Sequence, residues 1–215
     1  MTSLTRPDSL IFDMDGTLWD ASDTYTLAFN EAIRARGLQR ILQRADLDAI
    51  MGWEPRKAMA HLMPELAEEE QDALRHSVVD FQDRLLPRHG GVLYEGVREG
   101  LAALARKYRL FILSNCPKDT IRQFLHFTGL GPYITGEMAY GVNSMPKSHN
   151  MRLLVEQYGL QAPLYIGDTD GDRLQAELAG LPFVFVSYGF GEASAYALRF
   201  DSFAELTAYF LEQAG

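Results

Sequence analysis

The chain has 215 residues, of which 47% are hydrophobic and 23% are charged, and its formal net charge at pH 7 is −9. This composition predicts a well-packed globular protein and argues against a largely disordered chain. The negative charge also argues against nucleic acid as the main partner, because binding to a phosphate backbone needs a concentrated face of lysine and arginine.

The first residues contain only a short apolar run, Leu10 to Phe12, with charged residues on both sides of it. This run is too short for the core of a signal peptide or for a membrane span. The single cysteine, Cys116, leaves no internal disulfide and agrees with a reducing compartment. We therefore expect a cytoplasmic protein that does not bind membranes and, without a coiled-coil or repeat pattern, a monomer.

Short apolar runs that each end in a polar turn predict buried parallel strands. These runs cover residues 10–12, 110–113, 164–166 and 183–186. Between them, apolar residues recur at helical spacing. The alternation of strands and helices predicts an α/β fold with a parallel sheet.

The long interval between the first two predicted strands contains more residues than one crossover helix requires. Its apolar residues follow a helical period, which predicts a small all-helical subdomain. We place this subdomain at residues 20–89, inserted after the first strand into a core formed by residues 1–19 and 90–215.

The first strand ends in two aspartates, Asp13 and Asp15, followed by Gly16 and Thr17. In an extended segment, residues two apart point to the same side, so both carboxylates can face one ligand at the carboxyl end of the sheet. They can instead be ordinary turn residues. A calcium loop that begins at Asp13 is excluded, because its glycine and glutamate positions hold other residues.

A second acidic cluster, Asp168, Asp170 and Asp172, follows the strand predicted at 164–166. It also lacks the glycine and glutamate of a calcium loop. Acidic clusters at two strand ends can converge on a hard cation such as Mg²⁺, which binds a few carboxylates and keeps water and substrate phosphate as its other ligands.

Ser114 and Asn115 follow the strand predicted at 110–113, and Pro117 then suits the first turn of a helix. Their hydroxyl and amide groups could hold a phosphoryl group, or could merely cap the helix. Lys147 lies in a loop before a further predicted helix, where a lone lysine is commonly a solvated surface charge.

Taken together and in this order, the four motifs resemble those of the haloacid dehalogenase-like superfamily. The resemblance lies in residues 12–18, 113–115, Lys147 and residues 167–180. Residues 186–191 and the final helix are similar to the phosphoglycolate phosphatase-like branch. This resemblance implies a Rossmann-like core with a helical cap, and a Mg²⁺-dependent phosphatase for small phosphorylated metabolites such as phosphoglycolate or a sugar phosphate.

The resemblance also implies a role for each motif. Asp13 would attack phosphorus and form an aspartyl-phosphate, and Asp15 would protonate the leaving oxygen. A halide needs no such proton, so Asp15 favours phosphoryl chemistry over dehalogenation. The remaining implied roles are Mg²⁺ binding by Asp13, the Asp15 carbonyl and Asp168, phosphate binding by Ser114, Asn115 and Lys147, and support by Thr17 and Asp172.

Substrate choice is expected to depend on the cap, and we hypothesise that Arg56 in its loop contacts the leaving group. Ser148 follows Lys147 where relatives often have proline, which weakens that assignment. Two other functions stay open. One is a phosphomutase that resembles β-phosphoglucomutase and shares all four motifs, and the other is a non-catalytic binding module.

Overall fold

The computed structural model describes residues 6–213. Within this range a six-stranded sheet has the order β5-β4-β1-β6-β7-β8, and every neighbouring pair is parallel. The four predicted strands are present, and β5 and β8 extend the sheet at its two edges. The strands are β1 (Ser9–Phe12), β4 (Arg109–Ser114), β5 (Gly136–Ala139), β6 (Pro163–Gly167), β7 (Phe183–Val186) and β8 (Leu198–Phe200). The predicted α/β fold is therefore confirmed.

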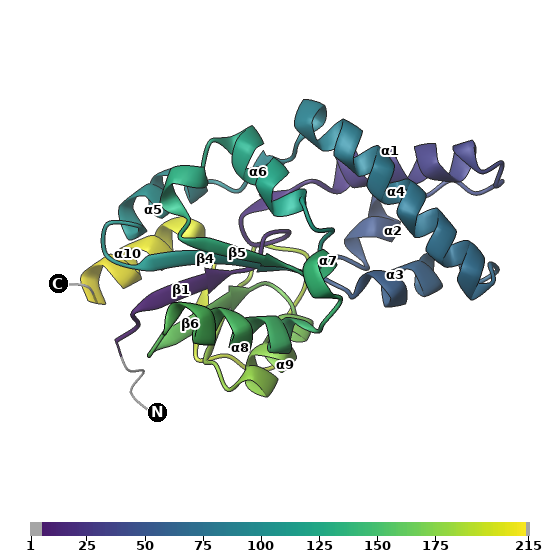
Figure 1. Cartoon of the computed structure of the whole chain (residues 1–215). Helices are drawn as coiled ribbons and strands as arrows, with labels where there is room; N and C mark the ends of the chain where they lie inside the picture. The colour runs from purple at the N-terminus through teal and green to yellow at the C-terminus, as the bar shows by residue number, and fades with distance from the viewer. Residues whose placement is uncertain (1–5, 214–215) are drawn as a thin grey trace.

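Helices cover both faces of the sheet (Figure 1). One face carries α5 (Val97–Leu104), α6 (Thr120–Thr128) and α10 (Phe203–Gln213), and the other carries α8 (Lys147–Tyr158) and α9 (Asp170–Ala179). The short helices η1 (Gly131–Tyr133) and α7 (Tyr140–Asn143) flank β5.

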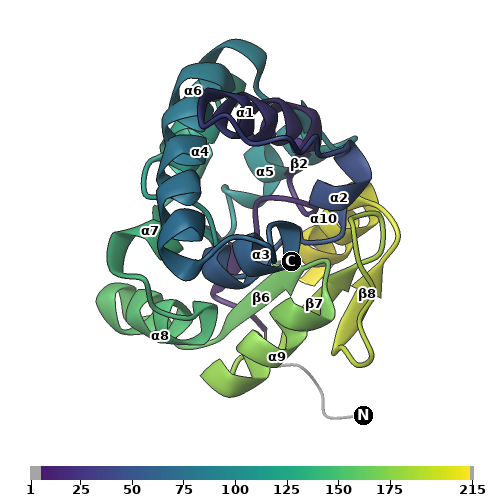
Figure 2. The same cartoon turned by 90° about the vertical axis from the view of Figure 1, so that its right-hand side faces the viewer.

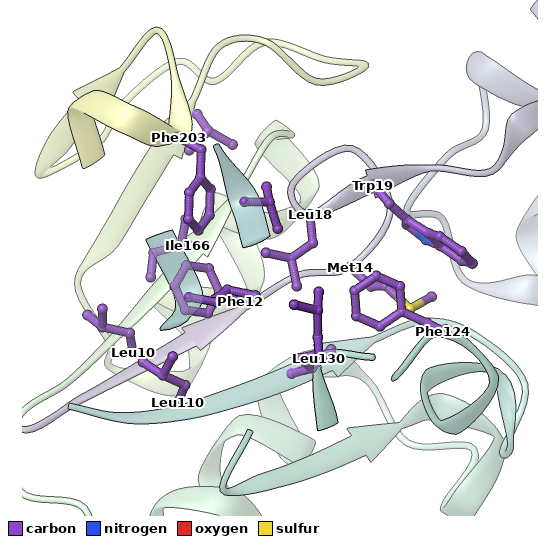
Figure 3. Packing of buried hydrophobic residues seen from close by; sticks show 14 of the residues in the cluster. Leu10, Phe12, Met14, Leu18, Trp19, Leu110, Phe124, Leu130, Ile166 and Phe203 are labelled. Atoms are coloured by element: carbon purple, nitrogen blue, oxygen red, sulfur yellow. The ribbon is translucent and has the colours of Figure 1, made fainter. Parts of the chain in front are cut away.

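Side chains of β1 alternate between these two helical layers, because successive residues of a strand point to opposite faces. Phe12 packs against Phe203 of α10, with ring centroids 5.9 Å apart, and Leu10 lies in the same cluster (Figure 3). Ile11 instead packs in the cluster that contains Met151 of α8. The central strand is thus buried on both sides, and the position of the residues that follow it is well determined.

Between β1 and β4 the chain forms α1 (Ser22–Ala35), α2 (Arg44–Asp48), α3 (Pro55–Leu62) and α4 (Glu68–His89). These helices lie beyond one end of the sheet and face the viewer in Figure 2. They enclose their own apolar cluster, which includes Ile33, Leu47, Met59 and Leu74. This arrangement agrees with an inserted helical cap at residues 20–89, and the division into domains stays a prediction.

The chain enters and leaves the helical insertion through β2 (Trp19–Asp20) and β3 (Val92–Leu93), which pair antiparallel. Further hydrogen bonds hold the insertion against the core. The Asn115 side-chain amide donates to the Gly52 carbonyl over 2.9 Å, and the Tyr140 hydroxyl donates to Glu54 over 3.0 Å. No helix within residues 6–213 is both long and apolar enough to cross a membrane.

Candidate active site

Asp13 follows β1 directly and is 1% exposed. Its backbone N–H donates to the Ile166 carbonyl over 2.8 Å, which continues the pairing of β1 with β6. Lys147, at the first turn of α8, places its ammonium 2.9 Å from Asp13 Oδ2 and 2.7 Å from Asp172 Oδ1. Because Lys147 is only 2% exposed, the alternative of a solvated surface lysine is excluded.

Asp172 is held by four hydrogen bonds. Its Oδ1 accepts from Lys147 and from the Tyr165 hydroxyl at 3.1 Å, and its Oδ2 accepts from the backbone N–H and the hydroxyl of Thr169. The Thr169 hydroxyl in turn accepts from the Asp172 N–H, which completes a capping box at the start of α9. The local capping motif thus orients the carboxylate that positions Lys147.

Asp168 follows β6 and accepts hydrogen bonds from the Phe190 N–H at 2.8 Å and from the Thr17 hydroxyl at 3.4 Å. Two glycines leave room for its carboxylate. A Cβ atom at Gly16 would lie 2.1 Å from Asp168 Oδ2, and one at Gly189 would lie 2.4 Å from it. Any side chain at either position would displace the Asp168 carboxylate.

Asp15 is 7% exposed and accepts two hydrogen bonds on Oδ1, from the Trp19 indole at 2.9 Å and from the Tyr25 hydroxyl at 3.0 Å. Burial raises the pKa of Asp15 to about 6, against the effect of these two donors, which lower it. A carboxyl group with a pKa close to neutrality suits general acid–base catalysis.

The three carboxylates of Asp13, Asp168 and Asp172 offer oxygens that lie within 4.8 Å of one another. Within residues 6–213, Lys147 is the ammonium that faces this cluster, so negative charge is in excess. Burial raises the pKa of Asp13 well above its ordinary value, against the charge of Lys147, and raises the pKa of Asp168 to about 7.

These features fit a divalent cation. Asp13 Oδ1 is buried without a hydrogen-bond partner among the described residues, and carboxylate oxygens are the ligands that hard cations such as Mg²⁺ prefer. Asp172 is the least available of the three carboxylates, because its oxygens accept four hydrogen bonds, one of them from the Lys147 ammonium, whereas Asp168 accepts one from Thr17 and one from Phe190.

Asp13 and Asp15 line a cavity of about 360 Å³ that lies between the strand ends and the helical insertion. Ser114, buried at the end of β4, and the half-buried Asn115 line it as well. The structure thus brings the motif residues together, although the Asn115 amide donates to Gly52. Of the predicted residues, Asp13, Asp15, Ser114 and Asn115 line this cavity. Lys147, Asp168 and Asp172 lie around Asp13, and Thr17 donates to Asp168.

Arg56 is not brought to this cavity. Its side chain is 61% exposed and forms ion pairs with Glu68 at 3.7 Å and Asp72 at 3.3 Å, so two carboxylates of α4 hold it at the surface. The cavity wall is instead reached by Arg75 and Gln82 of α4. Gln82 interrupts the apolar stripe of this helix, which is a signal that the sequence contained.

Trp19 and Tyr25, the two donors to Asp15, were also not predicted. No motif marks them, since their approach to Asp15 depends on how the chain turns through β2 into α1. The Thr169–Asp172 capping box was visible as a threonine three residues before an aspartate.

Comparison with known proteins agrees with the motifs. Residues 10–186 match the family described as haloacid dehalogenase-like hydrolase. The chain is 30% identical to "Probable phosphatase IndB" of Dickeya dadantii, over 84% of this chain and 81% of that protein. It is also 30% identical to a phosphoglycolate phosphatase of Colwellia psychrerythraea, over 94% of this chain and 96% of that protein.

A haloacid dehalogenase-like family hydrolase from Streptococcus pneumoniae has the same fold, with a TM-score of 0.84 at 21% identity, over 98% of this chain and 100% of that chain. The resemblance that the four sequence motifs predicted is confirmed. The chain belongs to the haloacid dehalogenase-like hydrolase family.

Proposed function

We propose that this hydrolase is a Mg²⁺-dependent phosphatase that releases phosphate from small phosphorylated metabolites through an aspartyl-phosphate on Asp13. At the coarser level, the chain is a phosphoric monoester hydrolase, as its family and its relatives named phosphatases indicate. The observation that carries the finer proposal is the buried Asp13, which has one unpartnered oxygen and lies beside Lys147, with Asp15 two residues further on.

In the proposed reaction, an Asp13 oxygen attacks phosphorus and the bond from phosphorus to the ester oxygen breaks. Asp15 donates a proton to the leaving oxygen. In the second step, Asp15 takes a proton from a water molecule that attacks the aspartyl-phosphate, which releases phosphate and regenerates Asp13. The Lys147 ammonium and the Ser114 hydroxyl would bind the phosphoryl oxygens as negative charge develops on them.

Asp13, the Asp15 carbonyl and Asp168 would hold the metal ion. When bound, Mg²⁺ would screen the repulsion between the carboxylate nucleophile and the anionic phosphoryl group. The support for this set is the orientation of Asp168 by Thr17. Asn115 stays a prediction as a phosphate ligand, because its amide donates to Gly52.

Several wider expectations also stay predictions from the sequence. They are a cytoplasmic location, a monomeric state, the absence of nucleic-acid binding, and a cap at residues 20–89 that covers the site.

The proposal is tested by measuring phosphate release from para-nitrophenyl phosphate and from a panel of phosphorylated metabolites, with Mg²⁺ and with a chelator. Release should require the metal, and Asp13→Asn should lower kcat by a factor on the order of 10³ or more, because the nucleophile is lost. Asp80→Asn, at an exposed position of α4, is the matched control and should keep full activity.

An Asp13→Asn variant that keeps the wild-type rate would exclude Asp13 as nucleophile. A folded wild-type protein that releases no phosphate, yet transfers phosphoryl groups between sugar phosphates, would support the mutase alternative instead.

A further inference from the structure

The cavity that contains Asp13 and Asp15 continues between α1, α3 and α4, where the leaving group of a phosphate ester would lie. Its wall there is mainly apolar. An apolar wall favours a ligand that removes apolar surface from water. The residues concerned are Phe29, Leu47, Ile50, Met59, Val78 and Val79.

The helical insertion already lies against the core in this structure, because hydrogen bonds at Gly52 and Glu54 hold it there. The cavity volume therefore applies to this arrangement of insertion and core. A volume of about 360 Å³ equals that of roughly twelve water molecules in the liquid. A leaving group as small as glycolate would leave much of this space to water that faces apolar side chains.

The buried part of the cavity wall also offers little to a charged leaving group. Arg75 reaches the wall, but its Nε and Nη2 each lie 3.3 Å from Asp72 Oδ1. Asp72 also pairs with Arg56, which pairs with Glu68, so two guanidinium groups face two carboxylates here. Lys118 and His76 line the cavity at exposed positions. Among the described residues of this wall, therefore, no buried and unmatched cation is available to bind a carboxylate.

Gln82 is the exception in the apolar wall. It lies one helical turn after Val78 on α4 and is 8% exposed, and its side-chain amide forms no hydrogen bond with any described residue. The amide atoms themselves are not fully buried, so water in the cavity can reach them, and a ligand that covered them without a hydrogen bond would leave a costly unpartnered amide. The Gln82 amide can both donate and accept a hydrogen bond.

We infer that the preferred substrate is the phosphate ester of a mostly apolar alcohol, larger than glycolate, that carries one uncharged hydrogen-bonding group opposite Gln82. This inference rests on the proposed phosphatase function. It separates this chain from its relatives named phosphoglycolate phosphatases, since glycolate brings a carboxylate where the wall offers apolar side chains and a neutral amide.

Binding of phosphonates tests the inference separately from the reaction, because a phosphonate has no ester oxygen and cannot be hydrolysed. Calorimetry would compare isopentylphosphonate with phosphonopropionate, the phosphonate analogue of phosphoglycolate, on the wild-type protein with Mg²⁺. The two ligands have a similar shape, but isopentylphosphonate ends in an apolar isopropyl group and phosphonopropionate ends in a carboxylate. We expect isopentylphosphonate to bind at least about tenfold more tightly, and straight alkyl chains to gain about fourfold per added methylene until the cavity is full.

Equal or tighter binding of phosphonopropionate would overturn the inference. The phosphonate affinities test the substrate inference whether or not para-nitrophenyl phosphate is hydrolysed. Failure of the inference and failure of the proposed phosphatase function are therefore separate results.

The role of Gln82 is tested with Gln82→Leu, which keeps a similar volume and removes the amide. Long alkylphosphonates should bind at least about fivefold more tightly to this variant, because they no longer bury an unpartnered amide. Gln213→Leu, at an exposed position of α10, is the matched control and should bind them like the wild type. Unchanged affinity of folded Gln82→Leu for the whole series would show that Gln82 does not face the leaving group.

Discussion

The carboxyl group of Asp15 is contacted by two side chains that lie outside the first motif. Burial raises its pKa to about 6, while hydrogen bonds from Tyr25 and Trp19 stabilise the carboxylate and oppose that rise. The proposed general acid must be protonated when the ester bond breaks. Its pKa therefore determines the pH above which the first step slows.

At the residue scale, Tyr25→Phe removes one of these donors and should raise the pKa of Asp15 further. Protonated Asp15 then persists to higher pH, so the alkaline limb of kcat/KM should move upward by about half a unit to one unit. The measurement is the pH profile of kcat/KM for an alkyl phosphate with saturating Mg²⁺, because an alkoxide leaving group needs the proton. Tyr133→Phe, whose ring packs beside the core, is the control. A downward shift, or none, would contradict this role of Tyr25.

The start of α9 serves helix stability and the candidate active site together. Thr169 caps the helix through the Asp172 N–H, and its N–H and hydroxyl hold the Asp172 carboxylate that binds Lys147. A short motif at a helix terminus thus controls the position of a buried ammonium from another helix, α8.

At the element scale, Thr169→Val preserves side-chain shape and removes the hydroxyl. The free energy of unfolding should fall by about 1 kcal/mol through loss of the cap. Because Asp172 loses a partner, kcat/KM should also fall by about tenfold. Chemical denaturation and steady-state kinetics measure both effects, with Thr169→Ser as the control that retains the hydroxyl. If Thr169→Val matched Thr169→Ser in both measurements, the capping box would have no such role.

At the scale of the whole molecule, Asp8 connects the amino ends of the central strands, at the end of the sheet opposite the candidate active site. This residue accepts hydrogen bonds from the backbone N–H groups of Gln161 and Ala162, the Ser9 hydroxyl and the Arg109 guanidinium. Burial alone would raise the pKa of Asp8, but these donors together hold it below its ordinary value. Asp8 therefore ties together the amino ends of β1, β4 and β6.

At the whole-molecule scale, Asp8→Asn should lower the free energy of unfolding at pH 7 by about 1 to 2 kcal/mol, because one acceptor oxygen and the charge are lost. A carboxylate whose pKa is lowered by folding stabilises the protein above its unfolded-state pKa of about 4. This contribution is lost as the pH falls toward the folded-state pKa. The difference between wild type and variant should hence shrink between pH 5 and pH 3.

Urea unfolding at several pH values measures this difference, with the exposed Asp80→Asn as the control. Phosphatase activity at pH 7 should be unchanged in Asp8→Asn, because Asp8 lies at the amino end of β1 and the candidate active site lies at its carboxyl end. A stability difference that grows with acid would contradict the assignment.

The sequence by itself determined the central strands and the motif residues that follow them. Buried parallel strands appear in the sequence as apolar runs, and their carboxyl ends lie at the same end of the sheet. Asp13, Asp15 and Asp168 could therefore be placed together from the local pattern alone. The edge strand β5 escaped this reasoning because its half-buried residues lack a β-branched run, and β8 escaped it because the exposed Arg199 interrupts its apolar residues.

Only the tertiary structure decided which side chains complete the site. Arg56 is directed to the surface by carboxylates of α4, whereas Gln82 of that helix faces the cavity. Likewise Trp19 and Tyr25 reach Asp15 through a turn of the chain that no local motif specifies. The physical reason is that strand patterns depend on near neighbours in sequence, while the face that a helix presents to a cavity depends on packing between elements far apart in the chain.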